Sequence, residues 1–124
     1  MSKTVEVEVL GKVYPAMVSL RVMSAIEERE GKTFNKAIVE LMRNAKTKDL
    51  IWLMRQLMLA GAVYARQEGL EAVDPPTEEE MLDLMDADGL LKLTDSLTAA
   101  LTTGQGSIEV RPPKNAEAAQ VEES

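Results

Sequence analysis

The chain has 124 residues, of which 21 are Asp or Glu and 14 are Lys or Arg, so its net charge is −7; it contains neither His nor Cys. The negative charge disfavours nucleic acid and anionic membrane surfaces as partners. The absence of Cys and His excludes disulfides and the usual zinc sites, and it removes the side chain that titrates near neutral pH. We therefore expect no catalytic centre, no metal site and no cofactor.

The apolar residues are mostly aliphatic, because the chain has eight Met but only four aromatic residues. Met side chains adapt to irregular shapes, so they suit a soft core and also a surface that fits a partner. The N-terminal residues alternate charge and Val and do not resemble a signal peptide. The longest charge-free apolar stretch, residues 56–65, is far shorter than the roughly 20 residues needed to span a bilayer. These features predict a soluble intracellular protein.

The N-terminal hairpin and the first two helices are predicted from the spacing of apolar residues and from residues that typically begin or end a helix. Val and charged residues alternate over residues 4–9, which predicts a strand that pairs with residues 12–14 in a hairpin. A helix is expected from the cap residue Ser19 to Glu30, with Gly31 at its C-terminal end. A second amphipathic helix is expected over residues 33–44.

A longer helix is predicted after Thr47, its expected N-cap, and this helix is apolar on most sides. It is either the central helix of a bundle or a helix whose second face awaits a partner. On the second interpretation, the candidate partner-binding residues are Trp52, Met54, Met58 and Tyr64. Gly61 inside this helix predicts the close approach of another backbone, since Gly costs about 1 kcal/mol relative to Ala there.

The C-terminal half begins with a stiff Asp-Pro-Pro connection at residues 74–76. Thr77 and Glu80 then match a capping box that starts a short helix. Asp88-Gly89 is expected to end that helix, and a final helix follows as far as about residue 101. The predicted fold is therefore mainly α, a small N-terminal β-hairpin packed on a bundle of about five helices. Residues 1–103 form the predicted domain and residues 104–124 a predicted disordered tail.

Charge is distributed unevenly along the chain. Residues 29–66 contain eight basic and three acidic side chains, whereas residues 68–88 contain nine acidic and no basic ones. The acidic fourth helix should therefore dock on the second and third helices, or alternatively it covers a groove meant for a partner. Asp86, Asp88 and Asp95 resemble part of a calcium loop, but Leu84 occupies the first ligand position, which argues against a site.

The order of these motifs resembles the tail assembly chaperones of long, non-contractile tailed bacteriophages and their prophages. The resemblance covers residues 5–101 and rests on Tyr14-Pro15, a Glu-x-x-x-Gly helix end at residues 27–31, a Leu/Met helix reaching Ala60-Gly61, and a Thr-Glu-Glu helix from Thr77. It implies a protein of the host cell cytoplasm that binds the tape measure protein during tail assembly and is absent from the mature virion.

The same resemblance implies further properties. The tail tube protein and a second copy of the chain are further expected partners. A longer product made by ribosomal frameshifting is also implied, and Pro113-Lys114-Asn115 is compatible with slippery codons. Two rival interpretations stay open: a bacterial adaptor or regulatory protein with a helix-binding groove, and a small hydrolase, which the missing His and Cys oppose.

Overall fold

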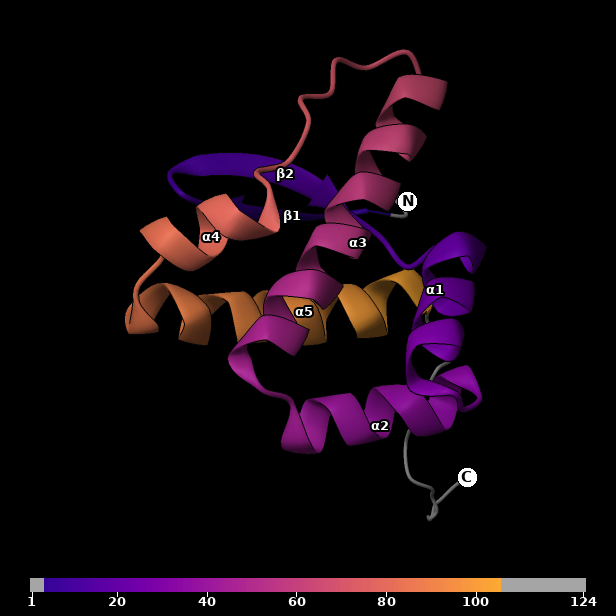
Figure 1. Ribbon diagram of the computed structural model, residues 1–124. Coiled ribbons are helices and arrows are strands. Elements are labelled where there is room, and N and C mark those ends of the chain that lie inside the picture. Colours follow the sequence, from indigo (N-terminus) through magenta and orange to yellow (C-terminus); the bar gives the residue numbers. More distant parts are fainter. Residues whose placement is uncertain (1–3, 106–124) are drawn as a thin grey trace.

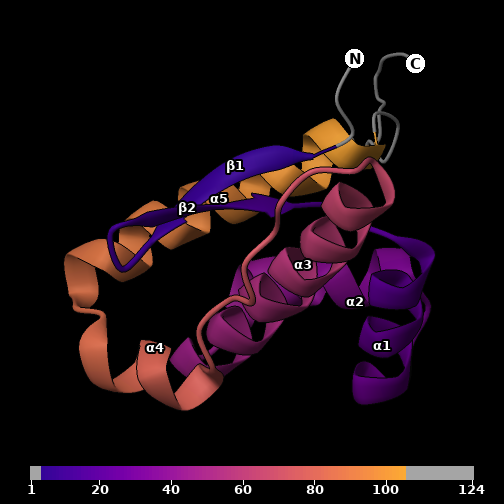
Figure 2. The ribbon, with the colours of Figure 1, turned by 90° about the horizontal axis from the view of Figure 1, so that it is seen from above.

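The computed structural model describes residues 4–105, which form a two-stranded antiparallel hairpin followed by five helices (Figure 1). The predicted fold class, mainly α with an N-terminal hairpin, is confirmed. Strand β1 (Val5–Val9) packs against helix α5 (Ala87–Gln105), and strand β2 (Lys12–Ala16) crosses the long helix α3 (Thr47–Gln67). Figure 2 shows the hairpin lying along α5, with α3 running at an angle to both. The core lies where these elements meet.

The hairpin turns at Leu10-Gly11, where both residues have positive φ, 52° and 80°. Positive φ at both central residues is the geometry of the tight turn that matches the twist of paired strands. Val7 pairs with Tyr14 across the hairpin, and both side chains are buried on the face that meets the helices. Strand β2 extends to Ala16, two residues beyond the predicted end.

Helices α1 (Leu20–Glu30) and α2 (Phe34–Asn44) follow the predicted ranges closely. The Ser19 hydroxyl accepts a hydrogen bond from the Val22 N–H at 3.3 Å, and Gly31 ends α1 in the left-handed conformation, with φ of 69°. The predicted cap and stop of α1 are thus confirmed. The start of α2 is stabilised by a residue of another helix: a carboxylate oxygen of Glu27 in α1 accepts the Phe34 N–H at 3.0 Å.

Helix α3 is central: it packs against β2, α1, α4 and α5. The prediction that Thr47 caps it is wrong, because Thr47 is already helical and Lys46 holds the N-cap position. The Lys46 N–H donates to the Asp49 carboxylate at 3.0 Å, which satisfies a backbone donor that the helix leaves unpaired. The predicted close approach of another backbone at Gly61 is confirmed, and the backbone is that of Pro15 and Ala16 in β2.

Helix α4 (Glu78–Leu84) starts with the predicted capping box. The Glu80 N–H donates to the Thr77 hydroxyl at 3.1 Å and the Thr77 N–H to the Glu80 carboxylate at 2.8 Å. The break after α4 comes earlier than predicted, at Met85 and Asp86, so the expected break at Asp88-Gly89 is wrong. Instead, Asp86 caps α5: its carboxylate accepts the Gly89 N–H at 2.9 Å.

Helix α5 runs to Gln105, beyond the predicted domain end at residue 103. The rest of the predicted tail, including the frameshift candidate at residues 113–115, lies outside the described residues.

Candidate partner-binding groove

Two of the four predicted contact residues belong to the core. Met54 is 0% exposed and Met58 is 1% exposed, and both pack in the cluster formed by the hairpin and the helices. They cannot contact a partner on the surface of this fold. For these two side chains, the interpretation of α3 as the central helix of a bundle fits the structure. The prediction that they contact a partner is corrected, because both are buried.

Trp52 and Tyr64 are half-buried. They lie twelve residues apart on α3, which places them about 18 Å apart along the helix axis and about a third of a turn apart around it. The Arg29 guanidinium lies over the Trp52 ring, 4.6 Å from its centroid, and it also donates to Asp49 at 2.9 Å. Trp52 therefore takes part in a clamp between α1 and the start of α3.

The Asp49 carboxylate is the electrostatic centre of this clamp. The hydrogen bond from the Lys46 N–H is the main cause that lowers the pKa of Asp49, and the hydrogen bond from Arg29 lowers it further. A charged carboxylate with two donors stabilises the junction between the two helices. The geometry is that of a structural ion pair.

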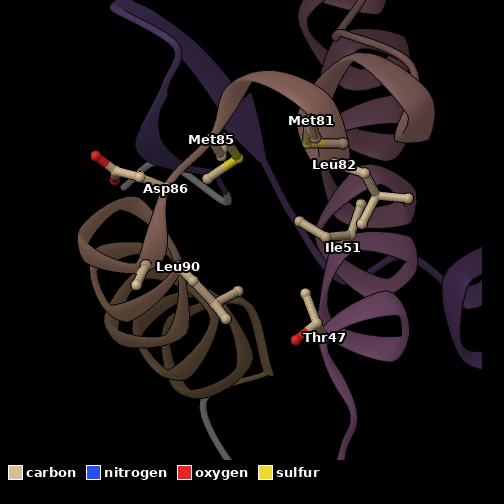
Figure 3. Close-up of a pocket in the computed structure, with 8 residues that line it drawn as sticks. Thr47, Ile51, Met81, Leu82, Met85, Asp86 and Leu90 are labelled. Atoms are coloured by element: carbon tan, nitrogen blue, oxygen red, sulfur yellow. The ribbon is translucent and has the colours of Figure 1, made fainter.

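A groove does open elsewhere, between the start of α3, helix α4 and the first turn of α5. Figure 3 shows α4 bridging the two other helices, with Ile51 and Thr47 on the α3 side, Leu90 on the α5 side, and Met81, Leu82 and Met85 above the space between them. Ala87 and Asp86 complete the lining. The Asp86 carboxylate points away from this space, toward the end of α5 that it caps.

The groove is apolar and small, with a volume of about 240 Å³. Of the residues that line it, Met81 and Ile51 are buried, whereas Leu82, Met85 and Leu90 are only partly covered. Small-molecule sites usually enclose roughly 300–1,000 Å³ and carry several convergent polar groups. This groove is smaller and offers one hydroxyl, that of Thr47, so its dimensions suit an apolar side chain of another protein.

Two further aliphatic side chains on α4 and α5 are exposed. Leu84 at the end of α4 is 67% exposed and Leu91 in the first turns of α5 is 68% exposed. Exposed aliphatic side chains also occur on other elements of the described structure, so these two do not by themselves mark a site.

Helix α4 carries exposed acidic side chains on the side opposite the buried Met81. Glu79 and Asp83 there form no ion pair within residues 4–105, while Asp88 of α5 lies 3.5 Å from Lys92 of the next turn. The start of α3 carries the exposed Lys46 and Lys48. Only one ion pair joins the basic and acidic segments in the described structure, Arg66 with Asp74 at 3.0 Å.

The connection before α4 is held by α3. Arg55 donates from Nε to the Pro76 carbonyl at 3.0 Å, and Pro75 is buried. Together with the fully buried Met81, these contacts fix α4 over α3 and keep the groove formed. The docking of α4 thus rests on backbone and apolar contacts, while the α4 carboxylates face solvent.

Sequence reasoning did not single out the groove residues. The signal was present, since Met81 and Met85 repeat at helical spacing and the charge pattern allowed a helix that covers a groove. What the sequence lacked was the arrangement in space, because the walls come from three segments that are up to about 40 residues apart in the chain.

A second hollow lies over α2 and is lined by Lys32, Lys36, Val39, Arg43 and neighbouring polar residues. Val39 is its only apolar lining residue, and Lys32 pairs with Glu40 across it. The hydrogen bond from Lys32 is the main cause that lowers the pKa of Glu40. This is a solvated basic face without an apolar anchor point.

Comparison with known proteins found no match: no family model, no curated protein and no solved structure is similar to this chain. The proposed function therefore rests on the geometry of the structure and on the sequence motifs.

Residues 4–105 offer neither a metal-binding cluster nor a membrane-spanning helix. No group of three or more Asp or Glu side chains there is arranged to hold a metal ion, and Asp86 serves as a helix cap in place of the calcium ligand considered above. Among the helices of residues 4–105, none combines the length and the apolar character that crossing a bilayer requires.

Proposed function

We propose that this chain is a non-catalytic tail assembly chaperone of a long-tailed bacteriophage or prophage, which binds the tape measure protein in the host cytoplasm while the tail is built. The observation that carries the proposal is the apolar groove between α3, α4 and α5, with its two Met side chains. The motif order over residues 5–101 supplies the family.

The groove suits transient binding of a protein segment. Met side chains adapt to different apolar shapes, so successive or variable client segments can fit the same walls. A small contact of this kind gives modest affinity, because an interface needs well over 1,000 Å² of total buried area for stable association. Modest affinity agrees with a chaperone that leaves as the tail tube forms around the tape measure.

The gene neighbourhood and a binding experiment test the proposal. Tail genes on both sides, with the tape measure gene downstream, are expected. The full chain should keep the co-expressed tape measure protein soluble and elute with it in size-exclusion chromatography. A tape measure protein that is equally soluble without the chain, and never elutes with it, would contradict the proposed function.

The same groove also fits a bacterial adaptor or regulatory protein that binds a helix of its partner. The gene neighbourhood separates the two functions, since an adaptor would lie beside the genes of a regulatory or proteolytic system instead of tail genes.

A further inference from the structure

We infer that copies of this chain associate head to tail, with the acidic face of α4 in one copy against the basic face of α2 in the next. Each copy then uses two different surfaces, one for each neighbour. Both surfaces lie outside the apolar groove, so this association does not depend on the proposed function.

The exposed side of α2 is basic. Lys36 and Arg43 are seven residues apart, about two turns, so they lie on nearly the same side of the helix, and both line the hollow over α2 together with Lys32. Lys32 pairs with Glu40, whereas Lys36 and Arg43 form no ion pair within residues 4–105. Three cations beside one carboxylate leave this face positive.

The exposed side of α4 has the opposite charge. Glu79 and Asp83 are one turn apart and lie on the side of the helix opposite the buried Met81. Neither carboxylate forms an ion pair in the described part of the chain. Glu80 is also exposed, and it keeps its negative charge while it serves in the capping box.

The two complementary faces do not meet within one chain. In Figure 1, α2 lies at the lower edge of the molecule and α4 at its left edge, and no ion pair joins these two helices within residues 4–105. A two-fold contact of either face with itself would place like charges opposite each other, which disfavours it. The remaining arrangement is a heterologous contact, α4 of one copy on α2 of the next, which closes into a ring or continues as a filament.

The contact is expected to be weak and sensitive to salt. Glu79 and Asp83 are about 6 Å apart along α4, and Lys36 and Arg43 are about 10 Å apart along α2, so the long basic side chains can reach both carboxylates. The hollow over α2 has no apolar anchor, so exposed ion pairs supply the attraction. Copies therefore associate at high protein concentration and low ionic strength, and screening by salt separates them.

Static light scattering of the purified full chain measures this association. At about 20 mM salt, the weight-average mass should rise with protein concentration without a plateau at the dimer, and at about 0.5 M salt it should return to that of the monomer. A chain that stays monomeric at low salt and roughly millimolar concentration overturns the inference. Association that stops at a dimer overturns it as well, because the contact would then be two-fold.

Charge reversal identifies the two faces. Glu79→Lys with Asp83→Lys reverses α4, and Lys36→Glu with Arg43→Glu reverses α2. Each double variant should lower the association constant at least roughly tenfold, because it places like charges opposite each other. Reversal of α4 also moves the net charge of −7 four units toward zero, which would strengthen association if only the overall charge mattered.

Matched controls make the same charge changes elsewhere on the surface. Glu6→Lys with Glu8→Lys changes the exposed face of β1, and Lys12→Glu with Arg21→Glu changes exposed positions of β2 and α1. Each control should associate more strongly than the variant with the same charge change on α4 or α2. A control that associates as weakly as its matched variant overturns the inference.

An equimolar mixture of the two reversed variants tests the pairing directly. One variant has two acidic faces and the other has two basic faces, so neither should associate alone, whereas the mixture should associate at least as strongly as the wild type. A chain with all four changes should regain self-association. Since only folded variants can restore the contact, this rescue separates a lost contact from a lost fold. A mixture that stays monomeric overturns the inference.

Discussion

Substitution of Gly61 by Ala tests the contact that joins the hairpin to α3. A Cβ atom at this position would lie 2.0 Å from the Pro15 carbonyl oxygen and 2.7 Å from the Ala16 nitrogen. Carbon and oxygen atoms normally approach to about 3.3 Å at the closest, so the two backbones must separate by more than about 1 Å. The hydrogen bond from the Met17 N–H to the Leu57 carbonyl, 3.1 Å long, would then be broken.

The expected cost combines opposing effects. Forcing an extra carbon into a packed contact costs about 1–3 kcal/mol, and loss of the hydrogen bond adds roughly 0.5–1.5 kcal/mol. The gain from replacing a helical Gly by Ala is about 1 kcal/mol, so the free energy of unfolding should fall by about 1–3 kcal/mol. For a domain of this size each kcal/mol lowers the melting temperature by about 4–8 °C.

Thermal unfolding followed by circular dichroism measures this effect, with Gly89→Ala as the matched control. Gly89 is also helical, and a Cβ there would meet Asp86 and Met85 side-chain atoms at 3.4 and 3.5 Å, which are ordinary contacts. The control should be as stable as the wild type or slightly more stable. The reasoning is refuted if Gly61→Ala is as stable as Gly89→Ala, because close approach at Gly61 would then cost nothing.

Three further predictions concern the core and the helix caps. Met58→Ala should lower the free energy of unfolding by about 2–5 kcal/mol, measured by urea denaturation; an unchanged stability would mean that Met58 is not core. Asp49→Asn should cost up to about 1 kcal/mol at pH 7. Because the folded state lowers the pKa of Asp49, this difference should disappear as the pH falls below the ordinary carboxyl pKa, and a difference that persists in acid would contradict the assignment. Thr77→Ala should cost about 0.5–2 kcal/mol, whereas Thr77→Ser should keep the cap and most of the stability.

The elements that local chemistry determines were predicted well from the sequence. Ser19 and Gly31 bound α1, and the Thr77–Glu80 box starts α4, because each signal acts within one turn of the chain. Gly61 was predictable for a related reason: Gly in the middle of an apolar helix is costly, so a close backbone contact is the usual compensation. The sequence could not show that the hairpin supplies this contact.

The wrong boundaries arose where two residues competed for the same role. Asp86 precedes the final helix and Asp88 lies in its first turn, whereas the sequence suggested that Asp88-Gly89 ends the helix before it. In the structure Asp86 is the cap and Gly89 falls in the first turn, where its N–H needs the carboxylate of Asp86. At the start of α3, Asp49 takes over the capping that Thr47 was expected to provide.

The candidate site depended on information that no single segment contains. Helix α3 is apolar on most sides, and the pattern alone could not decide which side stays uncovered. The hairpin crosses it at Gly61 and α4 packs on it through Met81, so Met54 and Met58 end in the core. At its junction with α4 and α5, helix α3 contributes Thr47 and Ile51 to the groove.

The uneven distribution of charge along the sequence also bears on the surface of α4. If the acidic segment merely docked on the basic one, its carboxylates would pair with the Arg and Lys residues of α2 and α3. In the described structure Arg29 pairs with Glu30 and Asp49, Lys32 pairs with Glu40, and only Arg66 forms an ion pair with the acidic segment, at Asp74 before α4 begins. The exposed Glu79 and Asp83 of α4 form no ion pair there. Like charges crowded on one short helix repel each other, and a basic partner is the contact that would relieve this repulsion.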